Sequence, residues 1–436
     1  MSMSDNYLKS RSIQETFRRY EDAVDLGAKT DSFLNSETLR SSRLAFSLRK
    51  RDSGHSLQFS ETITTRIVDV IIPVFGESPS LEKCIEAITS TKNCQVRITL
   101  VDNGTPENVI GQCERSNEIY QVIRNEQNVG FGQGCHQGIM ATESEYLVLL
   151  NSDAIVEEDT IPALVYELEK DSRVAVCGAT SLDERGSLSE FGRYFHRDAH
   201  SFSYGENENR SDPRFLSRLR VPYVSFICTA IAREEYIRVG GFDDEYFPAY
   251  YEDSDLCFRL KNQGSFVLVS PFARVNHIGG QSAQSLIDVE NIRENNRHKF
   301  LEAHREELNT IPEEIDETSY PHEKEMLIHQ EYSLRILVIS EKLEDAVMDQ
   351  IPEDTYDTFC SVLCFEADSH RANDLRRSGC EVSLDFGKKL HHWMRERIGL
   401  FDEVVFCDEW VATQLFEIVA YTQPSANILF HHTRTK

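Results

Sequence analysis

From residue 66 onward, short continuous apolar runs alternate with segments whose apolar residues recur at helical spacing. Continuous Val- and Ile-rich runs are typical of parallel strands that are buried on both faces. The first part of this pattern predicts strands at Val68–Val74, Val96–Asp102, Tyr120–Arg124 and Tyr146–Leu150, and helices at Leu81–Thr89 and Gly130–Ala141. Repeated βα units of this kind predict an α/β fold with a mostly parallel sheet, whose ligand crevice lies at the carboxyl ends of the strands.

The pattern resumes near the carboxyl end of the chain. Further strands are predicted at Leu334–Ile339, Cys360–Phe365, Glu381–Leu384, Glu403–Phe406 and Asn427–Phe430, and helices at Ala372–Ser378 and Trp410–Tyr421. Before them, the stretch around 302–332 is rich in Glu, Pro and His and has no long periodic run, which is typical of a linker. We therefore expect a helical N-terminal arm (1–65), an α/β domain (66–301), a linker (302–332) and a smaller Rossmann-like α/β domain (333–436).

The N-terminal arm has helical spacing and a segment rich in basic residues. Residues 1–65 show helical spacing without strand alternation, and Leu39–Arg51 mixes apolar side chains with five basic ones. Such a segment can lie on an anionic membrane surface or against a protein partner. A helix packed on the neighbouring domain, with its charges in water, explains the same residues.

Composition narrows the class of protein. A mean hydropathy of -0.42 and a hydrophobic fraction of 40% are those of a soluble globular chain. The sequence shows neither a signal peptide nor a run of about 20 apolar residues, so a cytoplasmic location is expected, with peripheral contact to the inner face of the membrane as an option. The formal charge of -27 disfavours nucleic-acid binding. The 11 scattered cysteines indicate buried small side chains rather than disulfides or a zinc site.

Three polar clusters follow apolar runs at distant places in the chain. They are Asn151-Ser152-Asp153, the acidic segment Tyr250–Asp255, and the isolated His277, which we expect just past a strand at Phe266–Val269. A strand-end Asp with a distant His suits a divalent cation, and a second carboxylate on a loop suits proton abstraction from a hydroxyl. The combination indicates metal-assisted group transfer.

Several motifs in order carry a resemblance to a known family. They are Val68–Val74, Asp102-Asn103-Gly104, Arg124–Phe131, Leu149–Asp153, Gly240–Asp243, Tyr251–Cys257 and Val275–His277. Together they resemble the family 2 glycosyltransferases of GT-A fold, and within them the rhamnosyltransferase-like branch that builds bacterial surface polysaccharides. The resemblance covers roughly Ile67 to Gly280. Each motif alone is weak, and their order makes the resemblance specific.

The resemblance implies a nucleotide site at Pro73, Val74 and Asp102, where a carboxylate accepts hydrogen bonds from a base N–H or a ribose hydroxyl. It also implies that Asn128 and Gly130 contact the nucleoside, the glycine because it lacks a Cβ. Both have plainer explanations. Asp102 could cap the following helix, and the loop could be a turn leading into a helix.

The triplet Asn151-Ser152-Asp153 stands where the family has its Asp-x-Asp metal motif, with Asn in place of the first carboxylate. The resemblance implies that Asn151 and Asp153 lie at the sugar nucleotide, and that Asp153 and His277 hold Mg²⁺ or Mn²⁺ at its diphosphate. A strand-end Asp can also cap a helix, and a histidine after a strand can have an ordinary surface role.

Asp253 is the residue that the resemblance implies as catalytic base, because an inverting in-line displacement needs one carboxylate to take the acceptor proton. Glu252 would support the acceptor or Asp253 itself. If a helix begins at Ser254, Glu252 and Asp255 should point elsewhere. The alternative is an acidic cluster that only favours a helix N-terminus. Departures from the family pattern at Gln133–His136 and Ser225–Cys228 leave donor and acceptor identity open.

The expected function is thus transfer of a sugar from a nucleoside-diphosphate sugar, a UDP- or dTDP-sugar, to a glycan or lipid-linked glycan in cell-surface polysaccharide synthesis. A non-catalytic scaffold that binds glycan or sugar nucleotide is the alternative. A nucleotidyltransferase ranks last because Phe75–Pro79 brings no basic residue for a triphosphate. The C-terminal domain weakly resembles the N-terminal half of a GT-B glycosyltransferase and has no glycine-rich phosphate loop, which favours a docking role. The sequence is compatible with an oligomer.

Overall fold

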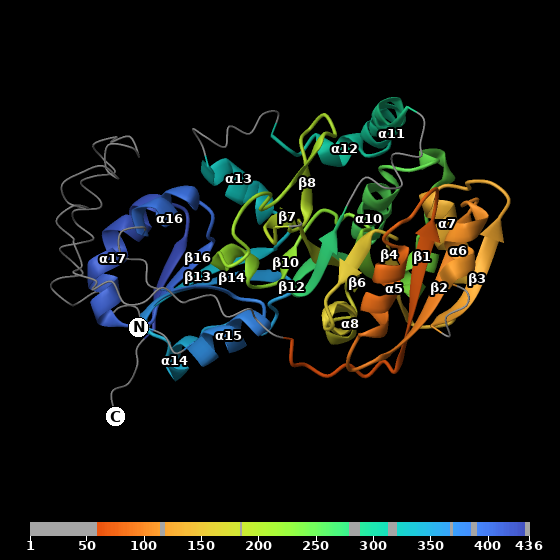
Figure 1. Ribbon diagram of the computed structural model, residues 1–436. Helices are drawn as coiled ribbons and strands as arrows, with labels where there is room; N and C mark the ends of the chain where they lie inside the picture. The colour runs from red at the N-terminus through yellow and green to blue at the C-terminus, as the bar shows by residue number, and fades with distance from the viewer. Residues whose placement is uncertain are drawn as a thin grey trace. The chain divides into compact units, whose positions relative to one another are not determined.

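The structure is a computed structural model, and it describes residues 59–113, 118–183, 185–278, 288–312, 321–366, 369–384 and 390–431. The chain divides into two compact units, with the boundary between residues 314 and 315 (Figure 1). This boundary lies inside the stretch that we expected to be a linker. The N-terminal arm up to residue 58 lies outside the described residues, so the helices expected there are not addressed.

The first unit is built on one large sheet. Its strands are β1 (Ile67–Val74), β2 (Gln95–Asn103), β3 (Ile119–Asn125), β4 (Tyr146–Leu150), β5 (Ala154–Val156), β6 (Val174–Leu182), β7 (Leu188–Glu190), β10 (Leu219–Arg220), β11 (Cys228–Ala232) and β12 (Phe266–His277). The spatial order is β10-β12-β6-β11-β4-β1-β2-β3, with β5 paired to β12 and β7 to β6. A separate hairpin joins β8 (Arg193–Phe195) to β9 (Ser201–Ser203).

The sheet is mixed rather than mostly parallel. β1 pairs in parallel with β2 and β4, and β6 pairs in parallel with β12. β11, however, runs antiparallel to both β4 and β6, and it lies between them. This strand is hard to predict from the sequence, because Cys228–Ala232 is only five residues long and has no alternation of apolar and polar residues that would mark it as antiparallel. The expectation of a mostly parallel sheet therefore needs this correction.

Helices flank the sheet of the first unit (Figure 1). They are α5 (Leu81–Thr89), α6 (Glu107–Cys113), α7 (Phe131–Met140), α8 (Thr160–Lys170), α9 (Arg233–Arg238), α10 (Glu252–Asn262), α11 (Val289–Ala303) and α12 (Arg305–Leu308), with short 3-10 turns at Pro213–Phe215 and Asp244–Tyr246. α7 packs on β1 and β2, and α8 on β6 and β12. The approach of α7 is close because Gly138 faces Ile71, where an added Cβ would lie 2.4 Å from the Ile71 side chain.

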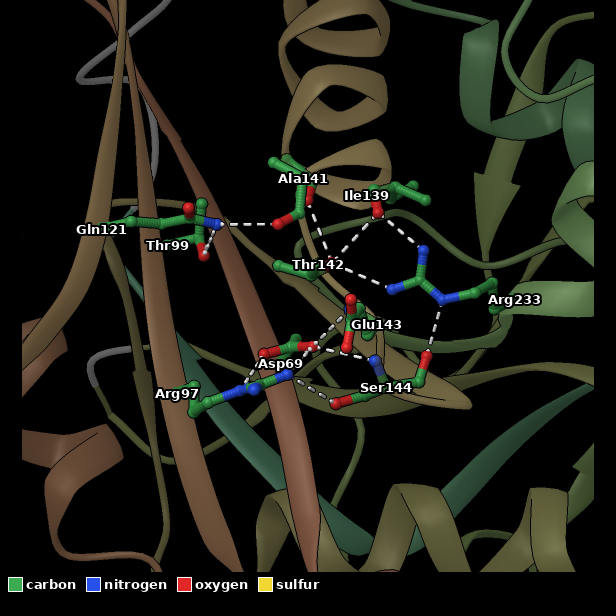
Figure 2. A network of polar contacts seen from close by, with 11 residues as sticks. Asp69, Arg97, Thr99, Gln121, Ile139, Ala141, Thr142, Glu143, Ser144 and Arg233 are labelled. Atoms are coloured by element: carbon green, nitrogen blue, oxygen red, sulfur yellow. Dashed lines mark hydrogen bonds and ion pairs between the residues drawn. The ribbon is translucent and has the colours of Figure 1, made fainter.

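A polar network closes the sheet at the amino end of β1 (Figure 2). The buried carboxylate of Asp69 accepts two hydrogen bonds of 2.7 Å from the guanidinium of Arg97 and one of 3.0 Å from the backbone N–H of Ser144. Arg233 donates to the carbonyl oxygens of Ser144 and Ile139 at 2.7 and 2.6 Å. The network fixes the turn between α7 and β4, at the edge of the sheet opposite the carboxyl ends of its parallel strands.

The second unit contains a five-stranded parallel sheet in the order β15-β14-β13-β16-β17. Its elements are α13 (Pro321–Ile328), β13 (Leu334–Lys342), α14 (Asp345–Met348), β14 (Thr358–Glu366), α15 (Ser369–Arg377), β15 (Glu381–Leu384), α16 (Leu390–Glu396), β16 (Glu403–Phe406), α17 (Glu409–Thr422) and β17 (Asn427–Phe430). The order reverses between β13 and β16, as in Rossmann-like sheets. The prediction of a second α/β region toward the carboxyl end is confirmed in that this region has its own parallel five-stranded sheet.

Asp408 occupies the point at which the strand order of the second unit reverses. Its carboxylate caps α17 by accepting from the backbone N–H of Val411 at 2.8 Å, and it accepts from the backbone N–H of Glu341 at 2.7 Å.

Two further expectations can be compared with the structure. Of the 11 cysteines, all are free thiols and all but Cys94 are buried, as predicted. In the described part of the chain, no helix is both long and apolar enough to span a bilayer. Residues 59–65, the described end of the arm, are not helical. They pack on the first unit through the buried side chains of Phe59 and Ile63.

Candidate active site

The expected nucleotide residues lie at the carboxyl edge of the large sheet. Val74, the last residue of β1, pairs in register with Asp102 of β2, and Asp102 pairs with Arg124 of β3. Pro73 is the preceding residue on β1 and is partly exposed. The parallel strands thus bring Pro73, Val74 and Asp102 to one edge, as the strand ends predicted.

The Asp102 carboxylate is engaged within the protein. One oxygen accepts from the backbone N–H and the hydroxyl of Thr105, both at 2.8 Å, and the other accepts from Arg124 at 2.8 Å. The contact with Thr105 closes the loop before α6, which begins at Glu107, so it is not the helix cap that the sequence offered as an alternative. Arg124, whose side chain is 51% exposed, adds a positive charge to this edge, although sequence reasoning gave it no role. Nucleotide binding by Asp102 stays a prediction.

The loop before α7 has an internal reason for its glycine. Gly130 has a φ of +89°, and an added Cβ would lie 2.9 Å from the carbonyl oxygen of Pro248 and 3.0 Å from the ring of Phe247. Asn128 accepts a 2.8 Å hydrogen bond from the backbone N–H of Gly130, and Asn103 donates to the Gly130 carbonyl at 3.1 Å. Gly130 therefore lets the loop pack against the segment that leads to Asp253. Contact of Asn128 and Gly130 with a nucleoside is untested.

Asp153 and His277 come together directly. β5 begins at Ala154 and pairs antiparallel with the end of β12, where His277 lies opposite Ala154. The backbone N–H of Ile278 donates to the Asp153 carbonyl at 3.1 Å, and the His277 Nε2 lies 3.2 Å from the Asp153 Oδ1. The two side chains are 6% and 22% exposed. The expectation that His277 follows a strand ending at Val269 is wrong, since β12 continues to His277 itself.

Asn151 begins the turn between β4 and β5. Its backbone N–H donates to the carbonyl of Ile227 at 2.9 Å, and its carbonyl accepts from the N–H of Ala154 at 3.1 Å. Ser152 is buried, with its hydroxyl 3.3 Å from that of Ser78. The turn thus holds the Asp153 carboxylate against His277 at the edge of the sheet.

One carboxylate and one imidazole are a donor set that suits Mn²⁺ and, less well, Mg²⁺. Among the residues that the structure describes, no group of three or more His, Cys, Asp or Glu side chains could hold a metal ion. Asp153 and His277 fit a cation that takes its remaining ligands from a diphosphate and water. A closed structural site, held by protein ligands alone, does not fit this pair.

The segment before α10 has an unusual backbone. Tyr250 and Tyr251 have φ values of +76° and +73°, which are unfavourable for tyrosine. The buried amide of Asn296 on α11 donates to the carbonyls of Tyr246, Ala249 and Tyr250 at 2.8, 3.0 and 3.1 Å. The Asn296 amide therefore holds the segment in this conformation, which fixes where α10 begins.

The three acidic side chains of this helix start have separate surroundings. α10 begins at Glu252, two residues before the expected start. Asp255 faces away from the expected site, because its carboxylate contacts Arg259 at 2.7 Å and His304 at 2.9 Å. Glu252 is buried, and its Oε2 has no hydrogen-bond partner among the described residues. Asp253 is half-buried and accepts from the backbone N–H and hydroxyl of Ser254 at 2.7 and 3.1 Å.

Burial changes the acidity of this pair. It raises the pKa of Asp253, although the hydrogen bonds from Ser254 and the charge of Arg193 oppose the rise. The pKa of Glu252 is raised well above its usual value by burial and by the neighbouring Asp253 charge. A carboxylate whose pKa moves toward neutral becomes a better proton acceptor when ionised. Of the two residues, Asp253 is the more exposed.

A short segment connects the Asp153 pair with the surroundings of Asp253. The backbone N–H of Ser225 donates to Glu190 at 3.0 Å, and Glu190 acts electrostatically on Asp253. Two residues later, the Ile227 carbonyl accepts from Asn151. The segment Ser225–Ile227 therefore contacts both the turn that carries Asp153 and the Glu190 side chain that acts on Asp253.

The departures from the family pattern pack inside the protein. Cys135 is fully buried, and His136 Nδ1 lies 3.0 Å from the hydroxyl of Tyr236. The ring of Phe226 is 5.7 Å from that of Phe242, which also contacts the ring of Phe131. These substitutions fill the space behind the loop before α7.

Residues 69–238 match the sequence profile of Glycosyl transferase family 2, so the first unit contains a domain of this family. Glycosyltransferase GlyG of Streptococcus pneumoniae serotype 4 is 27% identical over 195 residues, which cover 42% of this chain and 63% of that protein. The N-acetylglucosaminyl-diphospho-decaprenol L-rhamnosyltransferase of Mycobacterium tuberculosis is 23% identical over 240 residues, 49% of this chain and 76% of that protein. The resemblance to this family is confirmed, and its distant relatives include a rhamnosyltransferase.

Among solved structures, GalNAc-T7 with UDP, GalNAc and Mn²⁺ aligns with a TM-score of 0.45 and 17% identity, over 60% of this chain and 54% of that protein. The family match ends at residue 238, before Glu252, Asp253 and His277.

Proposed function

We propose that the first unit is a metal-dependent inverting glycosyltransferase that moves a sugar from a UDP- or dTDP-sugar to a hydroxyl of a glycan or lipid-linked glycan. The observation that carries the proposal is that the three acidic side chains at the start of α10 have different surroundings. Asp255 is bound to Arg259 and His304 and Glu252 is buried, whereas Asp253 as a residue is only half-buried and, among the described residues, its carboxylate is bound only by the adjacent Ser254. We further propose that the product belongs to cell-surface polysaccharide of capsule or O-antigen type.

Asp253 would take the proton of the acceptor hydroxyl as that oxygen attacks the anomeric carbon. The new glycosidic C–O bond forms while the bond between the anomeric carbon and the diphosphate oxygen breaks, and the electron pair leaves with the nucleoside diphosphate. A single displacement inverts the configuration at this carbon. Asn296 would contribute by holding the Tyr246–Tyr250 segment, so that the base is in place before the acceptor arrives.

Asp153 and His277 would hold Mn²⁺ or Mg²⁺ at the diphosphate, with Asn151 beside them. When bound, such a cation stabilises the negative charge that develops on the leaving diphosphate. Asp102, Asn128 and the end of β1 would bind the nucleoside, and Arg124 would supply positive charge at the same edge.

The test is a donor screen by nucleotide release, with acceptors that include a lipid-linked N-acetylglucosaminyl diphosphate, since the mycobacterial relative is named for such a molecule. Transfer should require Mn²⁺ or Mg²⁺ and stop with chelator. Asp253→Asn should lower kcat by about 10²–10⁴-fold. Full activity in Asp253→Ala would remove the proposed base.

Asp255→Asn is the matched control, because it removes a carboxylate two residues away on the same helix. It should weaken the contacts with Arg259 and His304 and lower stability, while transfer per folded molecule is kept. Calorimetry that detected sugar-nucleotide binding without metal dependence, together with no turnover, would instead favour a non-catalytic scaffold.

A further inference from the structure

A cluster of polar side chains lies beside Asp253 and comes from parts of the chain outside α10. Its centre is Arg193 on β8, whose side chain is 24% exposed. The guanidinium donates to the hydroxyl of Tyr223 at 2.8 Å and to the hydroxyls of Ser201 and Ser203 at 2.9 and 3.0 Å. The backbone N–H of Arg193 also donates to the carbonyl of Tyr223 at 3.1 Å. Arg193 is therefore held in one position.

Glu190 at the end of β7 is the negative partner in this cluster. Its side chain is 7% exposed and lies 3.3 Å from the Arg193 guanidinium. It also accepts hydrogen bonds from the backbone N–H and the hydroxyl of Ser225, at 3.0 and 2.8 Å. A carboxylate with three fixed donors does not rotate freely, so its charge has a defined place relative to its neighbours.

Both charges act on Asp253. Among the described residues, the charged and titratable groups that act electrostatically on Asp253 include Glu252 and Cys257 from its own helix, Arg193 and Glu190 from the β7–β8 segment, and Tyr223 from the chain before β11. The ring of Phe195, two residues after Arg193 on β8, lies 5.5 Å from that of Phe258 on α10 and 6.3 Å from that of Tyr251. The Tyr251 hydroxyl also donates to the carbonyl of Ala199 at 2.9 Å, so the β8–β9 hairpin packs against the start of α10. Arg193 is the one cation in this set.

We propose that Arg193 and Glu190 are an opposed pair of positioning residues, which fix the charges around the carboxylate of Asp253 and so set the pH range in which sugar transfer runs. The inference rests on the proposed function, because it assigns Asp253 the role of base. Neither residue needs to touch the substrate. Arg193 favours the ionised form of Asp253 and Glu190 disfavours it, so the two should act with opposite sign.

The experiment is the pH dependence of kcat/KM for the wild type and three variants of the full chain. The acid limb of this profile reports the pKa of the base in the free enzyme. Arg193→Gln removes the cation, so the limb should move to higher pH by roughly 1 unit. Glu190→Gln removes the opposing charge, so the limb should move to lower pH. Arg193→Lys keeps the charge and should restore most of the wild-type profile.

Arg214→Gln is the control for loss of a half-buried arginine in the same unit. Arg214 pairs with Glu208 and Asp212, outside the set of groups that faces Asp253, so its loss should leave the acid limb in place. If Arg193→Gln does not fold, the Glu190→Gln variant still tests the inference, because its acid limb should move to lower pH. A limb that does not move, or that moves the same way in both variants, overturns the inference while the function stands. Absence of transfer by the wild type from every donor would remove both.

Discussion

The buried contact between Asp69 and Arg97 allows a quantitative prediction about stability. Asp69 is fully buried and accepts four hydrogen bonds, two from Arg97 at 2.7 Å each and two from the backbone N–H groups of Ser144 and Glu143 at 3.0 and 3.3 Å. Asp69→Asn keeps the shape of the side chain and turns one acceptor oxygen into a donor that faces other donors. Arg97 is left without its carboxylate.

Breaking a buried pair by removing one partner costs about 3–5 kcal/mol. The Arg97 side chain is 23% exposed, so water recovers part of its solvation, and the asparagine keeps one acceptor. We therefore expect Asp69→Asn to lower the free energy of unfolding of the first unit by about 3 kcal/mol. The loss should appear mainly in the first unit, since Figure 2 shows that the network joins β1, β2 and the turn before β4.

The second unit offers a matched comparison. Asp402 accepts from the backbone N–H of Arg335 at 2.9 Å and from its guanidinium at 3.0 and 2.8 Å, but the Asp402 side chain is 38% exposed. Because exposed pairs contribute little, Asp402→Asn should cost about 1 kcal/mol or less. Both tryptophans, Trp393 and Trp410, lie in the second unit, so their fluorescence follows that unit during urea unfolding. Hydrogen exchange of the β1 amides reports the unfolding of the first unit.

The pH dependence has a defined sign. Burial tends to raise the pKa of Asp69, but the hydrogen bonds from Arg97 and Ser144 outweigh it and the pKa is lowered. A lowered folded-state pKa contributes stability above the unfolded value of about 3.9, and this contribution is lost as pH falls through the folded value. The difference between wild type and Asp69→Asn should thus be full at pH 7 and shrink below about pH 4. Equal losses for Asp69→Asn and Asp402→Asn at pH 7 would refute the reasoning.

Two further predictions concern the site. Gly130→Ala should lower the free energy of unfolding by roughly 1–3 kcal/mol and also lower kcat, because the added Cβ meets Pro248. Gly264 is the control, because it has a φ of +87° but no neighbour within 4 Å of an added Cβ. In urea unfolding and transfer assays, Gly264→Ala should show only the backbone cost of about 1 kcal/mol and a normal kcat. His277→Ala should raise the Mn²⁺ concentration for half-maximal transfer by about 10-fold or more, whereas His200→Ala, which removes an exposed His–Asp pair, should leave the metal titration unchanged. Equal effects within either pair would contradict the assignment.

The sequence predicted the regular parts of both units closely. The β-branched run expected as a strand at Val68–Val74 is β1 at Ile67–Val74, and the strand expected at Asn427–Phe430 has those bounds. These strands could be predicted because the apolar residues in their sequence are the residues that the fold buries; Val70 to Ile72, for example, are fully buried. The prediction for β12 ended too early because Pro271 interrupts the apolar pattern, and proline usually marks the end of a strand. The structure places an irregularity between Ser270 and Arg274, which lets the strand continue to His277.

The candidate site was predictable where chemistry and chain position coincide, and not where it depends on packing between distant segments. Asp153 and His277 follow from strand ends and motif order. Arg193 and Glu190 carry no signal in their own sequence, since both lie on strands of three residues, and their relation to Asp253 exists only after folding. Their neighbours become visible only when β7, β8 and α10 are placed together.

The same reasoning applies to Asn296, which lies well beyond the residues that match the family profile. Its single amide group donates to three carbonyls of the Tyr246–Tyr250 segment. Two consecutive tyrosines with positive φ cost of order 1–3 kcal/mol each, and they persist only where surrounding contacts hold them. The position of Asp253 thus depends on α11, a helix some forty residues later in the chain, as well as on the loop before α7 that packs against Pro248. A site of this construction is specified by long-range contacts to the backbone, and side-chain motifs alone do not reveal it.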